Sequence, residues 1–165
     1  DVHGSRGLGD VYKRQSPGHA KHHYSFYDEF SGTLFMGDTL GLIYPHGDFV
    51  QPNLPPPDFD KEILFKTLDS FEKLEIKQLA IAHFGIHKNA RELIKDAKES
   101  IENWILFISN IENLSNDDAS NELLKWLIRN YESLGIDNET IKNYIGNGNF
   151  VMQIEGIRNY LRRRS

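Results

Sequence analysis

Three segments of the chain end in side chains that commonly bind metal ions. His19 follows a Ser-Pro-Gly turn, Asp38 follows the apolar segment TLFMG, and His83 follows the apolar segment LAIA. Imidazole and carboxylate ligands together suit zinc, iron or manganese. No pair among the three has the i, i+4 spacing of a helical metal motif, so they converge only if their strands are neighbours in one sheet. Because the chain has no cysteine, any metal must be held by His, Asp or Glu.

Each candidate ligand also has a purely structural interpretation. A histidine at the end of a strand is often a hydrogen-bonded structural residue. A Gly-Asp pair after a strand is often a turn or a helix cap, and Pro-Gly is a common turn. The local patterns at His19, Asp38 and His83 therefore do not specify a site by themselves.

The remaining histidines of interest are candidates for supporting roles. His22 and His23 directly follow the first candidate ligand, and we expect them to orient the turn or line a substrate pocket, with simple packing or solvation as the alternative. His87 follows a glycine turn and is a candidate for lining the pocket rather than for binding metal. His46 lies in a proline-rich loop, where it either contacts substrate or is an ordinary surface residue.

Composition narrows the class of protein. The chain has 165 residues, 39% hydrophobic and 26% charged, which is typical of one globular domain. Its net charge of −5 does not favour a general nucleic-acid role. No apolar run is long enough to cross a bilayer and no signal-peptide pattern is visible, so we expect no membrane partner and a cytoplasmic location.

Periodicity predicts the elements that position the candidate ligands. Residues 24–37 read as a β-hairpin, and 40–58 as a loop rich in Gly and Pro. Asp58 is expected to be the N-cap of a helix. Residues 79–83 are expected to form a buried strand. A long amphipathic helix is expected to begin near Asn89.

Both ends of the chain differ in character from this middle part. After Leu114 the pattern predicts a helical extension, with helices at about 118–134, 137–145 and 148–163. Residues 1–15 carry no sustained period and resemble translated adapter sequence, so we interpret them as a non-native segment. The predicted organisation is a main domain at 16–114 and an extension at 115–165. The fold class is α+β, with a mixed sheet flanked by helices.

The order SPGHAKHHYSFYD, GTLFMGD, LAIAHFGIH resembles the second half of the metallo-β-lactamase fold family of metallohydrolases, over residues 16–112. The usual pattern there is Thr-Pro-Gly-His, a strand ending in Gly-Asp, and a strand ending in His; Ser16 stands where Thr is usual. The resemblance is strongest to the branch that includes glyoxalase II-like proteins and lactonases. It implies half of an αβ/βα sandwich, followed by the helical extension.

The resemblance also implies roles for the candidate ligands. His19 would bind a first metal, Asp38 would bridge both metals as the catalytic carboxylate, and His83 would bind the second. Two divalent ions, zinc or else iron or manganese, would hold a hydroxide that attacks an ester, thioester, lactone or related bond of a small-molecule substrate. A carboxylate between two cations offsets their repulsion, which suits Asp at position 38.

The family's other ligands come from an upstream His-x-His-x-Asp-His segment, and nothing in residues 1–18 matches it. We therefore expect this chain to be an incomplete and inactive fragment of a hydrolase. The alternative is a non-catalytic fragment or interaction module with the same fold. A homodimer is left open, because helical extensions in related hydrolases can form dimer contacts.

Overall fold

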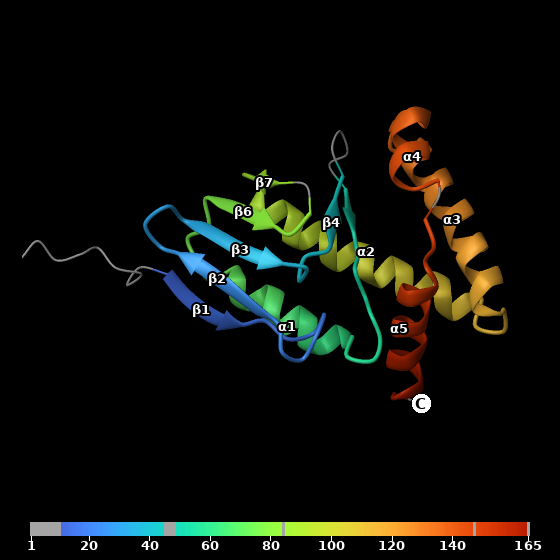
Figure 1. Cartoon of the computed structure of the whole chain (residues 1–165), viewed down its shortest axis with the longest axis horizontal. Helices are drawn as coiled ribbons and strands as arrows, with labels where there is room; N and C mark the ends of the chain where they lie inside the picture. Colours follow the sequence, from blue (N-terminus) through green and yellow to red (C-terminus); the bar gives the residue numbers. More distant parts are fainter. Residues whose placement is uncertain (1–10, 45–48, 84, 147, 165) are drawn as a thin grey trace, which may run out of the picture.

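The computed structural model describes residues 11–44, 49–83, 85–146 and 148–164, which form a mixed sheet with helices along it (Figure 1). Within these residues the main sheet has five strands in the order β1-β2-β3-β6-β7, and a separate short ribbon pairs β4 with β5. The strands are β1 Val11–Gln15, β2 Tyr24–Asp28, β3 Thr33–Gly37, β4 Leu42–Ile43, β5 Val50–Gln51, β6 Gln78–Ile81 and β7 Ile86–His87.

One parallel pair lies inside an otherwise antiparallel sheet. β1 pairs with β2, β2 with β3, and β6 with β7, all antiparallel, whereas β3 and β6 are parallel. A parallel pair needs a long crossover, which here contains α1. The consequence for function is that β3 and β6 end at the same edge of the sheet.

Five helices account for most of the rest of the described chain. Asp60 is the N-cap of the first, because its side chain accepts the backbone N–H of Ile63. The longest carries its buried residues at helical spacing along one face. None of the helices in the described part of the chain is both long enough and apolar enough to span a membrane. The helices are α1 Lys61–Phe71, α2 Ala90–Asn110, α3 Asn116–Ser133, α4 Asn138–Tyr144 and α5 Val151–Arg162.

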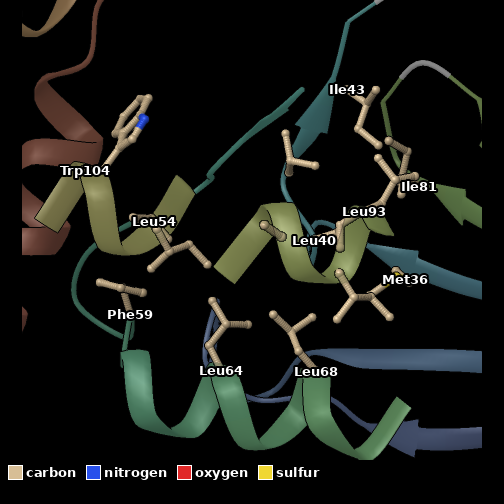
Figure 2. Close-up of a cluster of buried hydrophobic side chains, with 14 of the residues drawn as sticks. Met36, Leu40, Ile43, Leu54, Phe59, Leu64, Leu68, Ile81, Leu93 and Trp104 are labelled. Carbon is tan, nitrogen blue, oxygen red and sulfur yellow. The ribbon is translucent and has the colours of Figure 1, made fainter. Parts of the chain in front are cut away.

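The core lies between one face of the sheet and the helices. Leu34 and Met36 of β3 point to the same side as Leu79 of β6, and all three are fully buried. Figure 2 shows Leu64 and Leu68 of α1 pointing into the same cluster of buried side chains that contains Met36 of β3. The same cluster continues without a break through Trp104 into the last three helices, so the main domain and the extension share one core.

The other face of the sheet is open. Cross-strand partners on this face form a row, which we call the outer row: Phe26, Phe35, Ala80 and Ile86. The exposed fractions of its three large side chains are 42%, 46% and 61%. Large apolar side chains aligned in this way are unusual on a surface that faces only water.

The structure confirms the α+β class, the hairpin, the long helix and the three C-terminal helices, and it corrects several details. Asp58 is not the N-cap of α1; its carboxylate instead accepts the backbone N–H of Lys21. The loop predicted at 40–58 contains the β4–β5 ribbon. Residues 11–15, left out of the predicted fold, form an edge strand that pairs with β2.

Candidate metal site

Asp38 and His83 are brought together by the parallel strands. Gly37 lies opposite Ile81 in the register, and the backbone N–H of Ala82 donates to the Gly37 carbonyl at 3.1 Å. The next residues along each strand are therefore neighbours, and Nε2 of His83 lies 3.2 Å from Oδ1 of Asp38. Both side chains remain partly exposed, so a ligand can reach them from solvent.

Oδ1 of Asp38 is an acceptor with unused capacity. The atom is buried, and no hydrogen bond to it is formed by any residue the structure describes. The contact with His83 is close enough for an ion pair but lacks hydrogen-bond geometry. A buried carboxylate oxygen without a donor is costly unless a cation or proton occupies the space in front of it. This arrangement fits a metal ligand.

His19 is held in the tautomer that a metal ligand needs. The ring is buried, and its Nδ1 lies 2.8 Å from the carbonyl oxygen of Asn53. Because a carbonyl can only accept, Nδ1 carries a proton, and in the neutral ring Nε2 then keeps its lone pair. Histidines that bind metal commonly have the second ring nitrogen fixed in this way.

The His23 side chain contacts the Ser16 turn, the end of β3 at Asp38, and the His19 ring. Its Nδ1 lies 2.7 Å from Oγ of Ser16 and 2.9 Å from Oγ1 of Thr39. Its Nε2 accepts the backbone N–H of Asp38 at 3.3 Å, and its ring meets the His19 ring edge-on at 5.8 Å. Burial lowers the pKa of His23 and its proximity to the His19 ring lowers it further, while the nearby Asp38 carboxylate opposes this shift. The neutral ring can therefore accept from Asp38 and donate to a hydroxyl at once.

The glycine before Asp38 is required by this histidine. Gly37 has a φ of +56°, and a Cβ added there would lie 2.7 Å from Nε2 of His23. A side chain at this position would displace the ring that contacts the Asp38 backbone. The Gly-Asp pair thus has a structural reason that is visible only once His23 is in place.

The other predicted histidines lie elsewhere. His22 is exposed. His87 pairs with Leu79 and not with the end of β6, and its Nε2 is buried without a hydrogen-bond partner in the described chain. His46 lies outside the described residues. Sequence reasoning did not single out the hydroxyl of Thr39 or the carbonyl of Asn53, since neither residue type signals such a role.

The donors that the structure places here are a partial metal site. Asp38 and His83 form a pair, and His19 is joined to them through His23. Within the described ranges no group of three or more His, Asp or Glu side chains is arranged to hold one metal ion. The residues fit as ligands individually, and further donors are needed to complete coordination.

Comparisons with known proteins give a fold and no closer relative. No family model matches the chain, and no curated protein matches it. A metallo-β-lactamase family protein from Thermus thermophilus has a similar structure, with a TM-score of 0.61 and 18% identity. An archaeal metallo-β-lactamase superfamily protein from Sulfolobus tokodaii matches with a TM-score of 0.47 and 27% identity, over 55% of this chain and 33% of that one.

The extent of the first match is informative. It covers 93% of this chain but only 44% of the Thermus thermophilus protein, so this chain spans less than half the length of that structure. The α+β architecture of this chain is therefore that of the metallo-β-lactamase fold.

Proposed function

We propose that this chain is part of a metal-dependent hydrolase in which His19, Asp38 and His83 are metal ligands. The observation that carries the proposal is the Asp38–His83 pair, 3.2 Å apart at the shared edge of two parallel strands. The buried, unbonded Oδ1 of Asp38 and the fixed tautomer of His19 support it. Similarity in fold and the motif order of the sequence support the same reaction class.

In this proposal Asp38 would be the catalytic carboxylate shared by two divalent ions, of which His19 would hold one and His83 the other. Zinc suits this donor set, as do iron and manganese. When bound, such ions activate water and polarise the scissile bond of an ester, thioester, lactone or related small-molecule substrate. The sequence resemblance to glyoxalase II-like proteins and lactonases supports this choice of bonds.

The chain's own residues position these ligands. The Asn53 carbonyl fixes the orientation of the His19 ring, and the Asp38 backbone is held against His23. Ser25 donates to Ser16, whose oxygen lies next to Nδ1 of His23. This hydroxyl chain keeps the His23 ring from turning, and the ring thereby holds the backbone of Asp38 in place.

We further propose that this chain alone is inactive, because the described donors fall short of a complete site. Calorimetric titration with Zn²⁺ tests this directly. We expect at most weak binding to the isolated chain, since neither ion would have the usual three or four protein ligands. Sub-micromolar binding to the isolated chain would show that it already holds a complete site.

A longer protein that contains this chain provides the test of activity. Metal-loaded protein should hydrolyse members of a panel of ester, thioester, lactone and phosphodiester substrates. Asp38→Asn and His83→Ala should remove that hydrolysis together with most of the bound metal. Asp117→Asn, an exposed carboxylate on α3, is the matched control and should retain both. Unchanged metal content in Asp38→Asn would contradict the assignment.

The alternative function is a non-catalytic interaction module, and the outer row is the observation that favours it. The row presents Phe26, Phe35 and Ile86 on a sheet face that no described helix covers. In the hydrolase, the rest of the fold would cover this face. In the interaction module, a second copy of the chain would cover it. A longer protein that binds no metal and hydrolyses nothing, but dimerises through this face, would favour the module.

A further inference from the structure

A cleft with a volume of about 580 Å³ lies between α2, α3 and the start of β5. Its α2 wall is one helical stripe that includes Asp96, Glu99, Asn103 and Trp104, spaced three, four and one residues apart. Its α3 wall includes Trp126 and other residues of one face of that helix. The cleft shares no residue with the candidate metal site, so its function is a separate question.

Aromatic rings form much of the wall. Phe49 packs on Tyr131 with ring centroids 4.0 Å apart, and Tyr131 is almost completely buried. Trp126 stacks on Phe107 at 4.9 Å. Trp104 is fixed deeper in the core by an edge-on contact with Phe150 (Figure 2 shows Trp104 on α2). Trp104 and Tyr131 are almost completely buried, so the partly buried Phe49 and Trp126 supply the accessible aromatic surface of the cleft.

The charged side chains that line the cleft are negative. Asp96 and Glu99 are the charged side chains of its lining, and the described lining contains no Lys or Arg. Neither carboxylate forms an ion pair with any described residue. The nearby Lys98 pairs instead with two other carboxylates, those of Asp69 and Glu72 at the end of α1. Burial raises the pKa of Asp96 and the charge of Glu99 raises it further, while Lys95 partly opposes this shift. A nearby positive charge would relieve this repulsion.

We propose that this cleft binds a small organic cation, an ammonium group that carries apolar substituents. Aromatic faces attract such cations through their quadrupole, and carboxylates at the rim add a direct electrostatic attraction. An uncharged apolar ligand would gain nothing from Asp96 and Glu99, and an anion would be repelled by them. The inference does not depend on the proposed hydrolase function.

Choline is the probe, and the chain's own tryptophans report its binding. The chain has two tryptophans, and both line the cleft. Choline should change the intrinsic fluorescence in a saturable manner. Neohexanol, the uncharged isostere in which carbon replaces the ammonium nitrogen, should bind at least about tenfold more weakly. This comparison uses the unmodified chain, so it does not depend on how any variant folds.

Variants of Asp96 and Glu99 then test whether these two carboxylates attract the cation. Asp96→Asn with Glu99→Gln should weaken choline binding by about tenfold or more and leave neohexanol binding unchanged. The matched control is Glu102→Gln with Glu112→Gln, two exposed carboxylates outside the cleft, and it should bind choline like the parent chain. Absence of a saturable choline response, or equal affinity for choline and neohexanol, would overturn the proposal.

Discussion

A Cβ added at Gly37 would lie 2.7 Å from Nε2 of His23. This contact links the residue before Asp38 to the ring that accepts the Asp38 backbone N–H. Gly37→Ala must therefore displace His23 as well as strain a backbone with a φ of +56°. We expect the free energy of unfolding to fall by roughly 1–3 kcal/mol, measured by urea denaturation.

The steric part of this cost can be separated with a double-mutant cycle. His23→Ala removes the ring that the new methyl group would meet. Gly37→Ala in the His23→Ala background should then cost less than Gly37→Ala alone, because only the backbone strain remains. Gly85→Ala, at a positive φ but with no atom within 4 Å of the added Cβ, shows the strain alone. Additive effects of the two substitutions would contradict the contact.

Arg158 joins the end of α2 to the start of α3. Its guanidinium donates to Oδ1 of Asn116 at 2.5 Å and to the carbonyl oxygens of Ile111 at 3.1 Å and Leu114 at 2.8 Å. A lysine cannot reproduce this planar set of donors. Arg158→Lys should lower the free energy of unfolding by about 1–3 kcal/mol, whereas exposed Arg129→Lys should have little effect. Equal stability of both variants would argue against this role.

Tyr160 predicts how stability depends on alkaline pH. Burial, together with the hydrogen bond donated to Glu62, raises its pKa from 10.0 to about 12. Between pH 10 and about pH 12, the unfolded chain releases the phenol proton of Tyr160 while the folded chain keeps it. The stabilisation by Tyr160 is therefore fully present below pH 10 and is lost as the pH rises toward 12.

The measurement is the free energy of unfolding across this pH range for the parent chain and Tyr160→Phe. The other tyrosines are common to both proteins, so their titration cancels in the difference. The stability difference should be largest below pH 10 and should shrink as the pH approaches 12. A difference that stays constant across the range would show that Tyr160 does not titrate as described.

The outer row predicts a change in association without a large change in stability. Phe26→Ser with Phe35→Ser should alter the free energy of unfolding by no more than about 1 kcal/mol, the usual range for a cross-strand pair. The double variant should lose any self-association seen by sedimentation velocity and should bind less of an apolar dye. Ile63→Ser with Leu106→Ser, two exposed apolar residues on helices, is the control. Unaltered dye binding would argue against an exposed apolar surface.

Sequence patterns predicted the elements whose hydrophobic period is long or whose turns are distinct. The period of α2 indicated a helix from near Asn89, and the Ser31-Gly32 turn indicated the hairpin. β1 could not be predicted, because four of its five side chains are exposed and it is held by backbone pairing with β2. The helix start moved from Asp58 to Asp60 because both are good caps, and tertiary contacts with Lys21 engage the first.

The candidate site was predictable to a similar extent. Two apolar strands that each end in a metal-binding residue implied that Asp38 and His83 could meet, and the parallel pairing of β3 with β6 places them together. The hydroxyls around His23 and the carbonyl that orients His19 come from segments distant in sequence. No local pattern carries that information, because it arises only from tertiary packing.

The position of α5 determines when this chain can fold as it leaves the ribosome. Gly156 lies so close to the Leu54 carbonyl that an added Cβ would overlap it, and Arg163 donates to the Pro57 carbonyl, 106 positions earlier in the chain. Such distant partners mean that a nascent chain ending before this helix exposes apolar surface that the mature protein hides. Chains still bound to the ribosome should therefore expose this apolar surface until α5 has emerged from the exit tunnel.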